Sequence, residues 1–155
     1  MKAGSLYKKA NVTVLNCRSI VECYASLLMI DFEDTIENAV MSVNDTISNI
    51  YQLSIFQATK DIKFDKKIVK EHEFFALANN KILNKGNTLE AITLDTIKDV
   101  LHSNDYSVVT LYYGNSISDE YIEFIIDLLS SADLGVEVAC VSTKETLYNL
   151  TITFE

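Results

Sequence analysis

The pattern of hydrophobic and polar positions is clearest at Val108–Tyr113, where every residue is apolar or β-branched. A run of this kind is typical of a strand whose two faces are both buried. Gly114 and Asn115 end the run, because both residue types favour turns. The pattern therefore predicts a strand in the interior of a sheet, followed by a short loop.

The residues after this loop predict a helix. Ser118 supplies an oxygen that can cap the helix start, and Asp119 places negative charge on the first turn, where the helix dipole favours it. Apolar residues then recur at helical spacing up to Ala132, and Gly135 is placed to end the helix. A second strand is predicted at Val136–Val141, so the segment forms a β-α-β crossover unit of an α/β sheet.

The remaining elements follow from the same two periodicities. The final segment alternates apolar and polar residues, which predicts a strand with one buried face and one solvent-facing face. Ile62–Lys70 is rich in lysine and is predicted to be a loop or an edge strand protected by charge. The predicted strands are Asn11–Leu15, Tyr51–Ala58, Phe74–Ala78, Ile82–Leu83 and Leu147–Phe154, and the predicted helices are Ile20–Met29, Thr35–Ile50 and a helix that begins after Thr88.

These elements predict an α/β fold, with a mixed sheet, β-α-β crossover units and helices packed on the sheet. A chain of 155 residues has the length of a single domain, so residues 1–155 are predicted to form one α/β domain. Within it, residues 1–50 carry a strand-loop-helix-helix segment. Residues 51–155 carry the sheet, with a hairpin, two helices and the C-terminal strand.

Composition and charge exclude several classes of function. The chain is 48% hydrophobic with a net charge of −9, so it can bury a core but offers no basic surface to a nucleic-acid backbone. No apolar run approaches the roughly 18 residues of a membrane span. The three cysteines, Cys17, Cys23 and Cys140, lack CxxC spacing, which predicts reduced thiols and a cytoplasmic location.

The sequence contains no recognisable catalytic or metal-binding constellation. His72 lies in a charged surface run and His102 follows a predicted helix end, so neither has the neighbours of a metal ligand. The four glycines form no phosphate-binding loop. We therefore expect no catalytic residue, no metal and no cofactor, and we do not expect the chain to be an enzyme on its own.

Two segments resemble a known family. VVTLYYGNSISDEYIEFIIDLL and VEVACVSTKETLYNLTITFE are similar to the C-terminal region of the A component of fatty acid kinase, which is dihydroxyacetone-kinase-like (DAK) and whose distal part has a DegV-like fold. That region has a strand ending in a Tyr-x-Gly turn, an acidic helix start, a Val-Glu-Val strand, a tyrosine and a final glutamate. The residues in those places here are Tyr112, Gly114, Asp119, Glu120, Val136, Glu137, Val138, Tyr148 and Glu155. Upstream, Leu15–Asp31 resembles the family's strand-loop-helix segment, and the likeness covers residues 3–155.

The chain departs from the family pattern at several positions. Asn16 and Val21 stand where the family has prolines, Cys23 stands where it has a glycine, and Thr143–Thr146 replaces Gly-Gly-Gln-Pro. No segment matches the kinase's ATP-binding helical domain. The resemblance therefore implies a degenerate or truncated relative with a DegV-like C-terminal subdomain architecture.

The resemblance implies a non-catalytic docking module. This region resembles the part of the family's proteins that docks a DegV-like fatty-acid carrier protein, so such a carrier is the expected partner. The kinase-domain part of the same system is another expected partner. We expect the docking surface at loops that follow strands. Its candidate residues are Arg18, Ser19, Tyr24, Tyr112, Gly114, Asn115, Thr143, Lys144 and Tyr148.

Two alternatives to docking remain open from the sequence. One is a fatty-acid-like small molecule held in a cleft lined by Ile20, Tyr24 and Tyr112, which the DegV-like resemblance implies. The other is a homodimer, in which the final strand, Leu147–Phe154, pairs with its copy across a two-fold axis.

Overall fold

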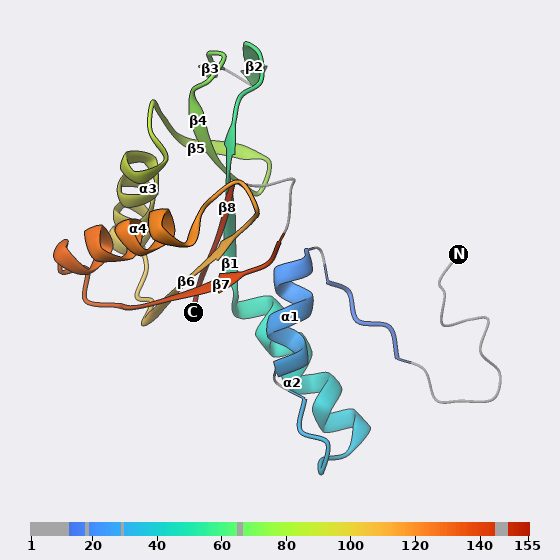
Figure 1. Ribbon diagram of the computed structural model, residues 1–155. Coiled ribbons are helices and arrows are strands. Elements are labelled where there is room, and N and C mark those ends of the chain that lie inside the picture. The colour runs from blue at the N-terminus through green and yellow to red at the C-terminus, as the bar shows by residue number, and fades with distance from the viewer. Residues whose placement is uncertain (1–12, 18, 29, 65–66, 145–148) are drawn as a thin grey trace. The chain divides into compact units, whose positions relative to one another are not determined.

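A computed structural model describes residues 13–17, 19–28, 30–64, 67–144 and 149–155 of the chain (Figure 1). It divides the chain into two compact units, Met1–Ile50 and Tyr51–Glu155. The division falls at the boundary between the two segments expected from the sequence. That both segments form one domain stays a prediction.

The described residues of the unit Met1–Ile50 form two helices, α1 (Ile20–Leu28) and α2 (Ile36–Asn49), which pack against each other. Both helices begin at a hydroxyl cap. The side chains of Ser19 and Thr35 each accept a hydrogen bond from the backbone amide three residues later, at 3.0 and 3.2 Å. Both helices therefore form close to their predicted bounds.

The predicted strand Asn11–Leu15 is wrong over its described part. Residues 13–17 have no regular secondary structure, and Asn11 and Val12 lie outside the described residues. A strand needs a neighbouring strand to satisfy its backbone hydrogen-bonding groups. None of the strands in the described ranges pairs with this segment.

The unit Tyr51–Glu155 is built on a mixed β-sheet with two helices. Its elements are β1 (Tyr51–Gln57), β2 (Ile62–Phe64), β3 (Lys67–Val69), β4 (Phe74–Ala78), β5 (Lys81–Gly86), α3 (Leu89–Ser103), β6 (Val108–Tyr113), α4 (Asp119–Ser131), β7 (Glu137–Ser142) and β8 (Leu150–Phe154). Six strands form one sheet in the order β5-β4-β1-β8-β6-β7 (Figure 1). In this sheet β6 and β7 are parallel, and every other pair of neighbours is antiparallel.

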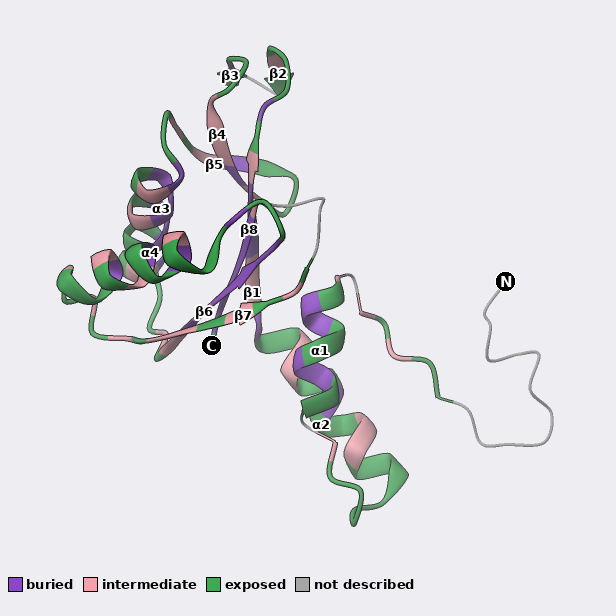
Figure 2. Ribbon diagram, viewed as in Figure 1, coloured by how far each residue is buried: buried purple, intermediate pink, exposed green. Residues whose placement is uncertain are grey.

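The C-terminal strand β8 lies in the middle of the sheet, between β1 and β6. Its register joins Leu53, Ile152 and Leu111 in one cross-strand row. All five residues of β8 are buried (Figure 2). The prediction that one face of this strand is exposed to solvent is therefore wrong, because its polar residues are buried as well. One of them, Thr151, shares a hydrogen bond of 3.2 Å with Ser54 on the neighbouring strand.

The same position contradicts a homodimer formed through the final strand. A strand can pair with a second copy only through a free edge. Leu150–Phe154 is paired on both sides, with β1 and with β6. Leu147 and Tyr148, the first residues of the predicted strand, lie outside the described residues.

The predicted β-α-β crossover unit is confirmed. β6 spans Val108–Tyr113 as predicted, α4 follows it, and β7 returns parallel to β6. Ser118 caps α4 by accepting a hydrogen bond from the amide of Tyr121 at 3.2 Å. The helix ends earlier than predicted, because Asp133 (φ 49°) already adopts a left-handed conformation before Gly135 (φ 70°).

The hairpin predicted between Phe74–Ala78 and Ile82–Leu83 also forms. β4 and β5 turn at Asn79 and Asn80, whose positive φ angles of 48° and 57° match the expected tight hairpin. The lysine-rich segment Ile62–Lys70 was predicted to be a loop or an edge strand. It contains two strands instead, β2 and β3, which pair with each other as a separate two-stranded sheet.

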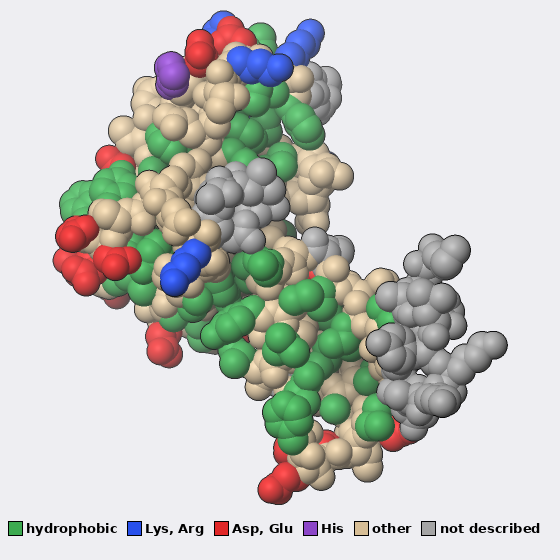
Figure 3. Space-filling model, turned by 45° about the vertical axis from the view of Figure 1, so that its right-hand side comes forward, with side chains coloured by type: hydrophobic (Ala, Val, Ile, Leu, Met, Phe, Trp, Pro, Cys, Tyr) green, Lys and Arg blue, Asp and Glu red, His purple; other side chains and the backbone are tan. Residues whose placement is uncertain are grey.

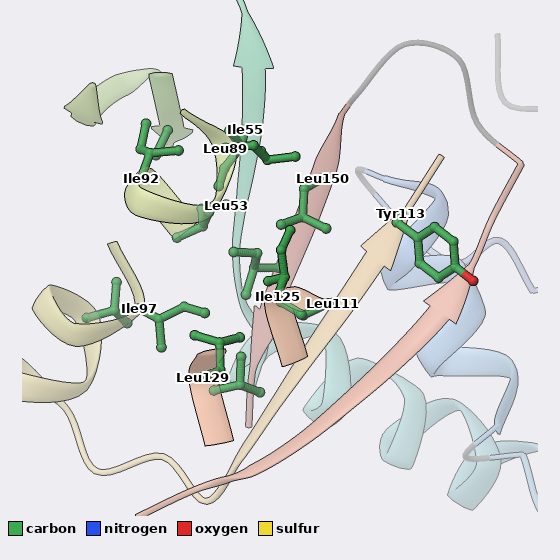
Figure 4. Packing of buried hydrophobic residues seen from close by; sticks show 14 of the residues in the cluster. Leu53, Ile55, Leu89, Ile92, Ile97, Leu111, Tyr113, Ile125, Leu129 and Leu150 are labelled. Carbon is green, nitrogen blue, oxygen red and sulfur yellow. The ribbon is translucent and has the colours of Figure 1, made fainter. Parts of the chain in front are cut away.

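The main core lies between the sheet and its two helices. α3 and α4 contact each other and pack over one face of the sheet (Figures 1 and 4). Buried side chains from both helices and from β1, β4, β6 and β8 form one hydrophobic cluster. Those labelled in Figure 4 are Leu53, Ile55, Leu89, Ile92, Ile97, Leu111, Tyr113, Ile125, Leu129 and Leu150.

Truncation of a buried β8 side chain should destabilise this unit strongly. Ile152→Ala removes three carbons from a fully buried site, so we expect the free energy of unfolding to fall by about 2–5 kcal/mol in chemical denaturation. Ile68→Ala on the exposed face of β3 is the control, with an expected loss of about 0.5 kcal/mol or less. Equal losses in the two variants would contradict the central position of β8.

Candidate functional site

The loops that follow the two parallel strands lie next to each other. The amide and the hydroxyl of Thr143 both donate to the carbonyl oxygen of Tyr113, at 3.0 and 3.1 Å. These bonds bring Thr143 and the exposed Lys144 beside Gly114 and Asn115 at the carboxyl ends of β6 and β7. The structure therefore gathers four of the candidate residues at the carboxyl ends of β6 and β7. Their role in binding stays a prediction.

The loop after β6 is rigidly attached to the helix that follows it. The amide of Ile117 donates to the carbonyl oxygen of Gly114 at 3.1 Å, and the Ile117 side chain is buried. The hydroxyl of Tyr113 donates to Asp119 Oδ1 at 2.8 Å. This hydrogen bond, together with burial, raises the pKa of Tyr113 above its ordinary value. The loop is thus held at both its ends.

A cavity of about 390 Å³ opens beside this loop. Its polar lining is mostly uncharged, and hydrogen bonds fix part of it. Asn149 Oδ1 accepts from the amide of Gln57 at 2.9 Å, and Asn149 Nδ2 donates to Ser116 Oγ at 3.4 Å. The lining residues are Gln57, Phe74, Asn87, Thr88, Leu89, Ser116, Ile117, Tyr121 and Asn149. Such a lining can hold the backbone or an uncharged side chain of another molecule.

One wall of the cavity is fixed by a hydrogen bond between the starts of the two helices. The hydroxyl of Tyr121 in α4 donates to the carboxylate of Glu90 in α3. Burial and this carboxylate raise the pKa of Tyr121 to about 12. The hydrogen bond from Tyr121 in turn holds the pKa of Glu90 below its ordinary value. At neutral pH the pair therefore consists of a neutral phenol and a carboxylate, which suits a structural contact better than proton transfer.

The remaining candidate residues are placed as follows. Ser19 is the cap of α1, Tyr24 is exposed on α1, and Tyr112 is buried in β6. Arg18 and Tyr148 lie outside the described residues. The cleft expected between Ile20, Tyr24 and Tyr112 would join residues of the two units, so it stays a prediction.

One side of α1 presents an exposed apolar stripe, formed by Ile20, Tyr24 and Leu27. Their side chains are 58%, 46% and 61% exposed, and they recur at helical spacing. Val21 and Ala25, on the other side of the helix, are buried. Figure 3 shows hydrophobic side chains gathered over α1 and α2. Contiguous exposed apolar residues of this kind mark interaction surfaces.

Sequence reasoning missed the residues that line the cavity. The helical pattern places Tyr121 on the core face of its helix, but its hydroxyl bonds Glu90, which is 31 residues away in the sequence. Gln57 and Asn149 meet at the ends of β1 and β8. The helix start predicted after Thr88 was a local signal for one part of the lining. The pairing between distant strand ends leaves no trace in the sequence pattern.

The described side chains offer no metal centre. Within these ranges, no group of three His, Cys, Asp or Glu residues lies close enough to hold an ion. The neighbouring thiol of Cys17 raises the pKa of Cys23 above its ordinary value. A raised pKa leaves less thiolate at neutral pH, which is the opposite of a reactive cysteine.

Comparison with known proteins places the chain in one family. Residues 1–155 match the model of the FakA-like C-terminal family, which is described by its likeness to the C-terminal part of the fatty acid kinase A component. The chain belongs to this family. The resemblance inferred from the sequence is thereby confirmed.

Relatives of this FakA-like chain occur in staphylococci. An uncharacterized protein of Staphylococcus epidermidis is 28% identical over 131 residues, which are 84% of this chain and 23% of that protein. A protein of Staphylococcus aureus is 24% identical over 130 residues, which are 83% of this chain and 23% of that protein. A protein of Staphylococcus haemolyticus is 23% identical over 130 residues, with coverages of 84% and 23%. The chain therefore spans about a quarter of the length of these curated relatives.

A solved structure shares the fold. The X-ray crystal structure of the Streptococcus pneumoniae fatty acid kinase (Fak) B3 protein loaded with linoleic acid matches with a TM-score of 0.54 and 10% identity, over 87% of this chain and 54% of that chain. The predicted α/β class, with its mixed sheet and packed helices, is confirmed by this match and by the observed sheet. Every helix in the described ranges falls short of the length and apolar character that a bilayer crossing requires.

Ultraviolet titration of Tyr121 tests the contact with Glu90. The raised pKa means that the native chain holds this phenol proton more tightly than the unfolded chain, whose tyrosines ionise near about 10. The associated stability is complete below about pH 10 and is lost as the pH rises toward about 12. Tyr121→Phe should remove a phenolate component that titrates near 12, and Glu90→Gln should move that component downward. If Tyr121→Phe instead removes a component that titrates near 10, the contact between Tyr121 and Glu90 is contradicted.

Proposed function

We propose that this chain is a non-catalytic docking module of FakA-like proteins, and that its partner is a fatty-acid carrier protein of DegV type. The observation that carries the proposal is the exposed apolar stripe of α1. Family membership supports a role inside a fatty acid kinase system, and the stripe supplies a surface that a protein partner would cover.

The stripe has the chemistry of a protein interface. Burying one large apolar side chain is worth about 1.5–3 kcal/mol, so the three residues Ile20, Tyr24 and Leu27 offer a large share of a micromolar affinity, which corresponds to about 8 kcal/mol. A few large side chains at the centre of an interface carry most of its binding energy. The stripe also begins next to Ser19, a candidate residue of the docking surface.

The charge beside the stripe favours a partner with basic residues. The turn between α1 and α2 and the start of α2 carry four exposed acids, Asp31, Glu33, Asp34 and Glu37. Acidic residues at the rim of an interface steer a partner of opposite charge and raise the association rate. We therefore propose that the carrier presents an apolar patch with lysine or arginine at its border.

We propose the loops after β6 and β7, in the unit Tyr51–Glu155, as a second and separate docking surface. Gly114, Asn115, Thr143 and Lys144 lie together there, and Ser116 and Ile117 of the loop after β6 also line the cavity described above. Ligands and partners of α/β sheets are commonly held at the carboxyl ends of strands. The rest of the longer relatives, which would include the kinase-domain part of the system, is a further candidate partner for this edge.

We also propose a cytoplasmic location. The three cysteines are free, and Cys23 and Cys140 are exposed. Exposed free thiols persist in a reducing compartment.

A charge placed in the stripe should weaken docking. Leu27→Glu would put a carboxylate into a contact that excludes water, so we expect the dissociation constant for the carrier to rise at least about tenfold, measured by isothermal titration calorimetry. Ile68→Glu is the matched control, because Ile68 is an apolar residue of the β2–β3 hairpin that is 51% exposed. Its binding should stay within about twofold of the unaltered chain.

Two results would contradict the proposal. The first is equal binding by Leu27→Glu and the unaltered chain, which would remove the stripe from the interface. The second is the retention of linoleic acid by the isolated chain in native mass spectrometry without any affinity for the carrier, which would favour the small-molecule alternative.

A further inference from the structure

The two edge strands of the six-stranded sheet differ in the residues that protect them against pairing with another chain. β5 and β7 are the outermost strands. The β5 edge is protected by lysines: Lys67 Nζ donates to the carbonyl oxygens of Ile82 and Leu83 at 2.8 and 2.7 Å, and Lys81 and Lys85 lie within the strand. Lysine on an edge strand is a common device against pairing with another chain.

The β7 edge has none of these protections. Its sequence, EVACVS, contains neither lysine nor proline, and its register with β6 runs without a bulge from Glu137 to Ser142. No strand in the described ranges pairs with its outer side. An unprotected strand edge is a template for β-strand addition.

The hydrogen bonds to β6 show which groups of β7 point outward. The amide of Glu137 donates to the carbonyl oxygen of Ser107 at 2.9 Å, and that of Thr143 donates to the carbonyl oxygen of Tyr113 at 3.0 Å. In a parallel strand pair, the backbone N–H and C=O groups of every second residue bond to the neighbouring strand, and those of the residues between point to the opposite side. The backbone groups of Val138, Cys140 and Ser142 are therefore directed away from β6, toward the outer side of β7, where none of the described strands pairs.

The helix next to this edge carries a single sign of charge. α4 contacts β7, and its sequence has four exposed acids, Asp119, Glu120, Glu123 and Asp127, and no lysine or arginine. A strand added to β7 would therefore place its own side chains beside an acidic helix. Charge complementarity selects a strand that carries lysine or arginine.

We propose that the outer edge of β7 receives an extended strand of the partner, with basic side chains directed toward α4. The inference rests on the proposed docking function and deepens it, because it names the mode of contact. The edge is continuous with Thr143 and Lys144 of the strand-end loops. A second copy of the chain fits this edge less well, because antiparallel pairing of two β7 strands would bring two acidic α4 helices together on one face.

Amide hydrogen exchange on the full chain tests the proposal directly. The probe is the fatty-acid carrier protein added to the chain at saturating concentration. The amides of Val138, Cys140 and Ser142 should become protected, whereas those of Ala139 and Val141 already bond to β6 and should change little.

Two variants of one residue give an independent readout. Cys140→Pro removes an outward amide and leaves the bonds to β6 in place, so the dissociation constant for the carrier should rise about tenfold or more. Cys140→Ala keeps the amide and should bind within about twofold of the unaltered chain. Retained protection of the β6 and β8 amides in Cys140→Pro shows that the sheet is intact.

The outcomes separate this inference from the docking function. Carrier binding with unchanged β7 amides and normal affinity of Cys140→Pro overturns the strand addition and leaves docking in place. Absence of any carrier binding overturns both. Protection of the β7 amides that depends on the concentration of the chain alone assigns the edge to a second copy and overturns the proposed partner.

Discussion

The pairing of β8 with β1 on one side and β6 on the other is the constraint on which the unit Tyr51–Glu155 depends. In the strand order, β8 links an antiparallel half, β5-β4-β1, to the parallel pair β6-β7. Both ends of the strand are held: Asn149 accepts a hydrogen bond from the amide of Gln57, and the carbonyl oxygen of Glu155 accepts one from the amide of Ser107 at 2.8 Å. The last residues of the chain therefore complete a core that begins at residue 51.

The same pairing positions the features that we connect with binding. β8 lies between β1 and β6 and pairs with both of them. The end of β1, the start of β8, the loop after β6 and the starts of α3 and α4 therefore contribute to one cavity. The contact between Tyr121 and Glu90 then ties the two helices together across it. The sheet also leaves β7 as its unprotected edge, next to an acidic helix. Each of these features arises from the order in which the strands pair.

The sequence predicted elements that are set by local pattern and missed those set by distant pairing. The strand Val108–Tyr113, the cap at Ser118 and the hairpin that joins Phe74–Ala78 to Ile82–Leu83 were all found, because each depends on a few neighbouring residues. The burial of Thr151 on a strand expected to be half exposed was not found, since it depends on Ser54, which is 97 residues away. For the candidate site, the loops at Gly114 and Thr143 were expected. The cavity beside the loop after β6 was not expected, because it is lined by residues from separate segments of the chain.

Amide hydrogen exchange of the free chain tests the central role of β8 most directly. Amides that open only by global unfolding exchange with the full free energy of unfolding, whereas those of peripheral elements open locally. We predict that the amides of Leu111 in β6 and Ile152 in β8 belong to the slowest group, with protection equal to the stability measured by chemical denaturation. Exchange of β8 at the rate of the separate β2–β3 hairpin would contradict this role, because the strand would then be an addition to the sheet rather than its centre.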